Sequence, residues 1–262
     1  MVFNPLGENL AILWDFIAML ISIVSLFILV QINALIRKNG KVSTIITRKL
    51  VHIFAGPIFI ISWLLFSGKI FSRFIAMIVP ILFVLQFIAI GTGKMKNESF
   101  VASMSRTGDP KELLGGTLYY AIIMVIITIF WFYFPENPTS LILIGCLSGG
   151  DGLADIIGRK YGGDKKFGIM GSRKTLIGTL AMFFGSFFIS IILVLIFSIV
   201  VPTMNIFTLI TPITFISVVT MIVEALSPKG IDNWTISVVV VVMALLFSTL
   251  VPEFWPFNFI SF

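Results

Sequence analysis

Long apolar runs, separated by short polar segments, dominate the chain. A helix that crosses the roughly 30 Å hydrocarbon core of a bilayer needs about 20 mostly apolar residues. Runs of that kind lie near residues 10–36, 50–67, 72–91, 115–134, 139–158, 175–201, 206–227 and 234–251. The pattern predicts an all-α integral membrane protein with about eight transmembrane helices, folded as a single domain over residues 1–262.

The composition agrees with this prediction. Hydrophobic residues make up 58% of the chain and charged residues only 11%, whereas a soluble domain carries roughly 25% charged residues. The net charge of +6 could suggest a nucleic-acid partner, but basic loops beside membrane spans explain it more simply, and no nucleic acid is expected. The single cysteine, Cys146, excludes an intrachain disulfide and a cysteine-built metal site.

The basic residues predict the orientation of the spans. Of the 18 lysines and arginines, all but Lys69 and Arg73 fall in one of the two alternating sets of connections. Cytoplasmic loops are rich in Lys and Arg, so both termini are expected outside and the basic loops in the cytoplasm. The N-terminus lacks the basic start of a cleaved targeting peptide, which favours a prokaryotic cell membrane. No oligomeric state is predicted.

Acidic residues gather at the cytoplasmic level of the predicted spans. At 1.5 Å per residue, Asp151 and Asp155 lie about 20 and 25 Å into the fifth run, and Glu224 and His52 reach a similar level from other spans. A charged side chain inside a membrane is costly, so such acids need a cation, a metal or a wet cavity. We expect an ion-dependent site; the simpler alternative is an ion pair with Arg159, four residues further on one helix face.

Four connections carry candidate residues for binding a nucleotide. Lys166, Ser172, Arg173 and Lys174 precede a helix, where backbone N–H groups and cations can bind phosphate oxygens, although such loops usually only set topology or contact anionic lipid. The third loop contains Arg106 and Glu112, and the second span begins with Arg48 and His52. The sole histidine cannot form a multi-histidine metal centre. Asp232 and Asn233 precede the last span and are equally explained as helix caps.

Five segments, in this order, resemble the phytol kinase family, within the wider group of membrane lipid kinases that includes farnesol and dolichol kinases. They are RKLVHIFAG at 48–56, SRTGDPKELLGGTLYY at 105–120, GGDGLADIIGRKYG at 149–162, SRKTLIGTLAMFFGS at 172–186, and VEAL with IDN between 223 and 233. Members of this family use a cytidine, sometimes a uridine, triphosphate and a divalent metal to phosphorylate a long isoprenoid alcohol. One departure is Ile231, where family members often have a second acid.

The resemblance implies that Asp151, Asp155 and Glu224 form the metal and catalytic centre, with Mg²⁺ as the ion. Asp151 or Glu224 would accept the hydroxyl proton, and Lys174 would act beside them. The candidates for binding the nucleotide are Arg48, His52, Arg106, Glu112, Arg159, Lys160, Lys166, Ser172, Arg173, Lys174, Asp232 and Asn233.

We therefore expect a CTP-dependent kinase, with UTP as a second possible donor, that phosphorylates phytol, farnesol, geranylgeraniol or a similar polyprenol drawn from membrane lipid. The alcohol dissolves in the bilayer and the nucleotide in the cytosol, so the reaction belongs at the cytoplasmic interface. One alternative is a CTP-dependent cytidylyltransferase acting on a lipid phosphate. Another is an ion-coupled transporter, which predicts polar residues through the whole depth of the membrane, whereas the outer halves of the spans are nearly all apolar.

Overall fold

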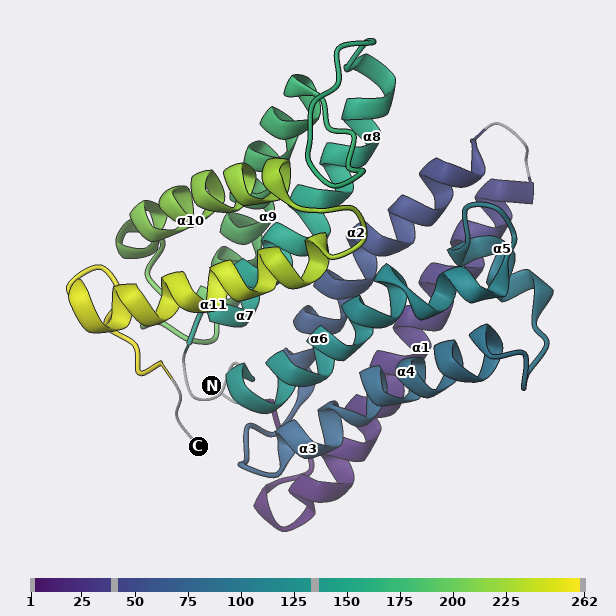
Figure 1. The fold of residues 1–262 in the computed structure, drawn as a ribbon. Coiled ribbons are helices and arrows are strands. Elements are labelled where there is room, and N and C mark those ends of the chain that lie inside the picture. The colour runs from purple at the N-terminus through teal and green to yellow at the C-terminus, as the bar shows by residue number, and fades with distance from the viewer. Residues whose placement is uncertain (1–2, 39–41, 133–136, 260–262) are drawn as a thin grey trace. The chain divides into compact units, whose positions relative to one another are not determined.

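The computed structural model describes residues 3–38, 42–132 and 137–259 (Figure 1). Every regular element in these ranges is helical, and the one extended pairing there is an isolated bridge between Phe167 and Lys174. The helices group into two compact units, an N-terminal unit, Asn4–Ile129, and a C-terminal unit formed mainly by Phe130–Phe262. The prediction of a single domain stays a prediction, and each unit is described by itself.

Eight helical segments of the described ranges are long and apolar enough to cross a membrane, which confirms the predicted fold class. Their ends agree with the predicted runs to within several residues. For the run predicted over 115–134, residues 133 and 134 lie outside the described residues. The segments are Glu8–Lys38, Ile45–Leu65, Ser72–Gly91, Pro110–Trp131, Thr139–Tyr161, Leu176–Ser198, Ile206–Leu226 and Asp232–Leu250.

The N-terminal unit is built on long helices joined by short ones. Its long helices are α1 (Ala11–Lys38), α2 (Thr44–Ser62), α4 (Ile78–Gly91) and α6 (Gly116–Trp131), which ends at the boundary of the unit; the short elements are η1 (Glu8–Leu10), η2 (Trp63–Leu65), α3 (Ser72–Ala76), α5 (Glu98–Met104) and η3 (Pro110–Leu114). Helix α1 packs along α2. Val51, Phe87, Ile90, Met104 and Leu113 are buried in one apolar cluster that holds α2, α4, α5 and η3 together.

A buried polar network also joins α1 to the start of α3 and to the segment before it. The Asp15 side chain is fully buried and accepts hydrogen bonds from the Ser67 backbone N–H (2.6 Å), the Ser67 hydroxyl (3.1 Å) and the Ser72 hydroxyl (2.5 Å). A buried carboxylate is tolerated only when such donors surround it. Sequence reasoning attached no role to Asp15, because its donors come from residues more than 50 positions away.

The C-terminal unit contains α7 (Thr139–Ile144), η4 (Gly145–Gly150), α8 (Asp151–Tyr161), α9 (Leu176–Ser198), α10 (Ile206–Leu226) and α11 (Asp232–Leu250). Helix α9 packs against η4, α8 and α10, and α10 lies beside α11 (Figure 1). This packing brings the start of α8, the end of α10 and the start of α11 close to the loop that leads into α9.

The fifth predicted run forms one continuous helical segment whose centre, η4, is a π-helical turn. Glycines let this turn approach α9 closely: a Cβ on Gly149 would lie 2.6 Å from the Gly185 carbonyl oxygen. Single π turns inside α-helices are rare and often occur at functional sites. Here the turn ends directly before Asp151 and so determines where that carboxylate lies on α8.

Candidate active site

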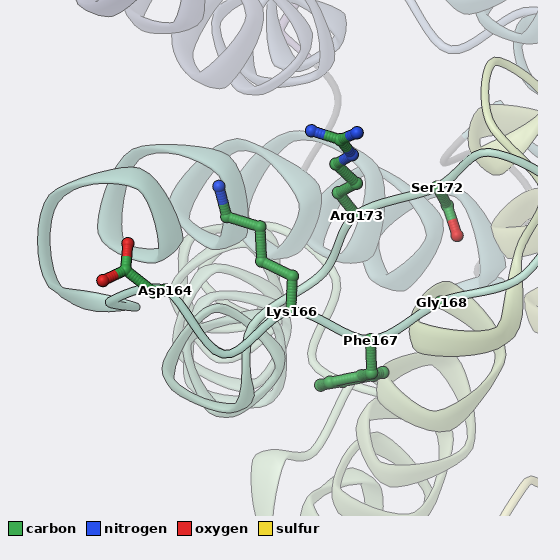
Figure 2. Close-up of a pocket in the computed structure, with 6 residues that line it drawn as sticks. All are labelled: Asp164, Lys166, Phe167, Gly168, Ser172 and Arg173. Carbon is green, nitrogen blue, oxygen red and sulfur yellow. The ribbon is translucent and has the colours of Figure 1, made fainter.

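Residues 162–175, called the basic loop below, are ordered by a two-residue bridge. The Phe167 N–H donates to the Lys174 carbonyl at 3.0 Å, and the Lys174 N–H donates to the Phe167 carbonyl at 2.7 Å. Side chains of such a pair lie on one face, and those of the adjoining residues lie on the other. Figure 2 shows this alternation, with Lys166 and Arg173 on one side of the loop and the Phe167 ring on the opposite side.

The tip of the basic loop is closed by Ser172. Its hydroxyl donates to the Ile169 carbonyl at 2.8 Å and accepts from the Ile169 N–H at 3.1 Å. Met170 and Gly171 turn the chain with φ values of 45° and 82°, and only glycine adopts the second at little cost. Ser172, predicted as a phosphate ligand, therefore shapes the turn.

An open pocket of about 430 Å³ lies against the basic loop (Figure 2). Lys166 and Arg173 line it, and within the described ranges neither makes an ion pair. These two cations outnumber the one carboxylate of the lining, Asp164, so the pocket suits an anionic ligand such as a phosphate chain. The complete lining is Asp164, Lys166, Phe167, Gly168, Ser172 and Arg173.

On the opposite face of the bridge, Lys174 reaches a group of acids. Its ammonium forms an ion pair with Glu224 at the end of α10, and lies 3.8 Å from Asp232 Oδ2 at the start of α11. Asp151, at the start of α8, acts electrostatically on both Lys174 and Glu224. The Glu224 side chain is only 3% exposed and Asp151 is also buried. We call Asp151, Glu224 and Asp232 the acidic cluster.

The acidic cluster keeps Lys174 charged. Burial lowers the pKa of its ammonium, but the attraction of Glu224, Asp151 and Asp232 outweighs that effect, and the pKa is raised above its ordinary value. At neutral pH Lys174 is therefore a cation that neutralises carboxylates, and it is not a proton acceptor.

The remaining candidates on α8 pair locally. Arg159 Nε lies 2.5 Å from Asp155 Oδ1, as the four-residue spacing on one helix face suggested. The Lys160 ammonium lies 5.0 Å from the centre of the Tyr161 ring, within the range of a cation–π contact. Asp155 therefore faces a cation of its own helix.

The start of α11 is tied to the end of α10. The Ser227 and Thr235 hydroxyls lie 2.6 Å apart, and the Asn233 N–H donates to Asp232 Oδ1 at 3.1 Å. Asn233 is buried with 4% of its surface exposed. These contacts hold Asp232 beside Glu224, so the two acids reach Lys174 from different helices.

The donor chemistry of this site fits a hard divalent ion, but not an all-protein cage. Within the described ranges, no three His, Cys, Asp or Glu side chains are arranged to hold a metal ion. Mg²⁺ prefers oxygen ligands and commonly takes one or two carboxylates, with phosphate and water oxygens completing its shell. Asp151 and Glu224 offer such oxygens, and the ammonium of Lys174 shows that positive charge is accommodated there.

In the N-terminal unit, Glu112 organises its own loop. Its carboxylate accepts hydrogen bonds from the Ser105 hydroxyl at 2.8 Å, the Arg106 N–H at 2.5 Å and the Thr107 hydroxyl at 2.9 Å. The Arg106 side chain is exposed. Both residues were predicted to bind nucleotide; the structure assigns Glu112 an ordering role and leaves Arg106 at the surface of that loop.

Arg48 and His52 lie one turn apart on α2 of the same unit. The His52 ring is 4.6 Å from the Tyr120 ring of α6, and the Tyr120 hydroxyl lies 3.4 Å from the His52 carbonyl. Both α2 residues are partly buried. The sequence analysis did not select Tyr120 as a candidate, nor the pocket residues Asp164, Phe167 and Gly168. The one pattern that could have pointed to Phe167 is the alternation of side chains about a short extended pair.

Comparison with known proteins supplies relatives in plants. The chain is 31% identical over 246 residues to phytol kinase 1 of Arabidopsis thaliana, covering 93% of this chain and 76% of that protein. It is 41% identical over 155 residues to a probable phytol kinase 2 of Oryza sativa, covering 59% and 49% of the two chains. It is 39% identical over 130 residues to a farnesol kinase of Arabidopsis thaliana, covering 50% and 42%.

The match thus spans about half the length of the rice protein. No protein-family model and no solved structure matches the chain. The named relatives are chloroplast proteins, which does not support the expected prokaryotic cell membrane. The similarity to the Arabidopsis phytol kinase extends over nearly the whole of this chain and three quarters of that protein. The chain therefore belongs to the family of phytol and farnesol kinases.

Proposed function

We propose that the chain is a membrane kinase that transfers the γ-phosphate of CTP, or of UTP, to a long isoprenoid alcohol such as phytol, farnesol or geranylgeraniol. Membership of a family with phytol and farnesol kinases supports the reaction type and the class of alcohol. The cytidine donor and the position at the cytoplasmic interface follow from the sequence resemblance and the distribution of basic residues.

The observation that best supports the proposal is that the basic loop directs its cationic side chains to two different faces. One face presents Lys166 and Arg173 to an open pocket, while the other places Lys174 among the buried carboxylates. Phosphoryl transfer depends mainly on positioning and on neutralising charge, with little covalent participation by the protein. The cations that would bind phosphate lie on elements adjoining the acids that would bind metal or accept a proton, all within one unit.

Each group then has a defined task. Lys166 and Arg173 bind and orient the phosphate chain. Asp151 or Glu224 accepts the proton of the alcohol as its oxygen forms a bond to the γ-phosphorus and the bond from that phosphorus to the bridging oxygen breaks, releasing CDP. Mg²⁺, once bound with the nucleotide, would supply positive charge at the phosphate oxygens, and Asp151 and Glu224 are the residues that would hold it. Asp155, the third acid expected at the metal, pairs with Arg159 instead.

The decisive experiment follows the label of the nucleotide. Purified protein in lipid vesicles is incubated with Mg²⁺ and with CTP labelled at either the α- or the γ-phosphate, together with phytol, farnesol, geranylgeraniol, diacylglycerol or a lipid phosphate. We expect γ-label in an isoprenoid monophosphate, with CDP released and with chelation of Mg²⁺ abolishing turnover. Transfer of α-label to a lipid phosphate with release of pyrophosphate would identify a cytidylyltransferase, and an absence of labelled isoprenoid would overturn the proposal.

A further inference from the structure

The position of Lys174 among the acids raises a question that the proposed function leaves open. Its ammonium pairs with Glu224, which is nearly inaccessible, and lies 3.8 Å from Asp232. Asp151 attracts it from the start of α8. The cation thus contacts or faces carboxylates of three helices, and two of those carboxylates are the ones assigned to Mg²⁺.

An ammonium and a divalent cation compete for these carboxylates. Like charges a few ångströms apart repel strongly where little water screens them. Binding of the metal at Asp151 and Glu224 therefore favours withdrawal of Lys174 from Glu224. A withdrawn ammonium in turn needs a new anionic partner.

We propose that Lys174 is an exchangeable counter-cation: it neutralises the acidic cluster until metal and nucleotide arrive together, and then transfers its charge from Glu224 to the phosphate oxygens. This inference rests on the proposed function and adds to it the order and coupling of binding. Metal alone must displace an ammonium that has no anion to accept it. Nucleotide supplies that anion, so metal and nucleotide bind with positive coupling.

The basic loop is built for a movement of one side chain. Both backbone hydrogen bonds of Lys174 are made to Phe167, which holds its main chain in place. Thr175 then starts α9 as an N-cap, accepting a hydrogen bond from the Gly178 N–H. Four flexible methylene groups separate this fixed backbone from the ammonium. Withdrawal of the ammonium from Glu224 therefore needs only side-chain rotation.

The test measures metal binding without turnover. Mn²⁺ replaces Mg²⁺, and free Mn²⁺ is quantified by electron paramagnetic resonance with the full chain in detergent and no nucleotide present. We expect Lys174→Gln to bind Mn²⁺ about tenfold more tightly than the wild type, because the competing cation is gone. The matched control, Lys166→Gln, removes one positive charge from the other face of the same loop and should leave Mn²⁺ affinity unchanged.

A second variant keeps the test informative if Lys174→Gln fails to fold. Lys174→Arg keeps the positive charge and can pair with carboxylates, so it should bind Mn²⁺ no more tightly than the wild type. Any of three results would overturn the exchange. Folded Lys174→Gln could bind Mn²⁺ no more tightly than the wild type, Lys166→Gln could bind it as much more tightly as Lys174→Gln does, or Lys174→Arg could bind it more tightly than the wild type. The kinase proposal is judged separately. Labelled isoprenoid phosphate with no effect of Lys174→Gln on Mn²⁺ binding overturns only the exchange. Tighter Mn²⁺ binding by Lys174→Gln without labelled isoprenoid phosphate overturns the kinase, and of the exchange it leaves only the competition between Lys174 and the metal.

Discussion

Single side chains with the same charge have different surroundings in this protein. Lys166 and Arg173 line a pocket, whereas Lys174 is partly buried among carboxylates, although the three lie within nine positions of the chain. The acids differ in the same way. Asp155 is paired with a cation on its own helix, and Glu224 with one from a distant loop. The partner, more than the residue type, determines what each charge can do.

Asp151 is the residue whose replacement tests the chemistry most directly. Asp151→Asn preserves shape and removes the negative charge, so turnover should fall by at least about 100-fold if the carboxylate takes part in proton transfer or in metal binding. The measurement is the initial rate of isoprenoid phosphate formation from labelled CTP, with folding checked by size-exclusion chromatography. Asp109→Asn, at an exposed helix cap, is the control and should stay active. Full activity of folded Asp151→Asn would refute the assignment.

Glu112 should matter for order in its loop. Glu112→Ala removes the acceptor of three hydrogen bonds and should lower the free energy of unfolding by roughly 1–2 kcal/mol. The loop around exposed Arg106 should then be cut faster by trypsin. Limited proteolysis and thermal unfolding in detergent measure both effects, and Glu253→Ala, an exposed acid, should show neither. If Glu112→Ala resists trypsin like the wild type, the carboxylate does not order this loop.

At the level of elements, the contact between η4 and α9 determines the position of Asp151. Glycine and serine at this contact let two backbones approach closely, and the chain widens into a π turn just before the carboxylate. Small residues at helix contacts are the usual means of close packing within membranes. The site on α8 thus depends on a surface of α9 that carries no chemistry of its own.

Gly149→Ala tests this dependence. The added Cβ would lie 2.6 Å from the Gly185 carbonyl oxygen, so the helices must separate, at a cost of about 1–3 kcal/mol typical of overpacking. We expect a lower melting temperature together with reduced kinase activity, because Asp151 moves with η4. Val238→Ile adds one carbon on an exposed face of α11 and should change neither quantity. Wild-type stability and rate in Gly149→Ala would show that the contact is looser than described.

For the whole molecule, orientation in the membrane is the property that connects the site to its substrates. Eight described segments can span a bilayer, and the basic loop follows the fifth of them. If both termini are outside, as the distribution of basic residues predicts, that loop lies in the cytoplasm, where a water-soluble nucleotide would reach it. Lys69, between the second and third spans, would lie on the opposite side.

Cysteine labelling checks the orientation, because the single native thiol, Cys146, is fully buried. In intact bacterial cells that produce the protein, an impermeant maleimide should label Lys69→Cys and leave Lys165→Cys unlabelled. Permeabilised cells should label both variants and so control for accessibility of the introduced thiols. Labelling of Lys165→Cys alone in intact cells would reverse the topology and place the basic loop outside.

The amino-acid sequence by itself determined the eight helical spans, because length and apolarity alone decide which segments can satisfy their backbone hydrogen bonds within a bilayer. Through segments that resemble known kinases it also predicted a set of acids and cations, of which the structure brings Asp151, Lys174, Glu224 and Asp232 together. The pairings within that group were decided by tertiary structure. Lys174 joins Glu224, 50 positions away, because α10 and α11 pack beside the basic loop, and the bridge to Phe167 selects which lysine faces inward. Such choices depend on contacts between distant segments, which no local pattern encodes.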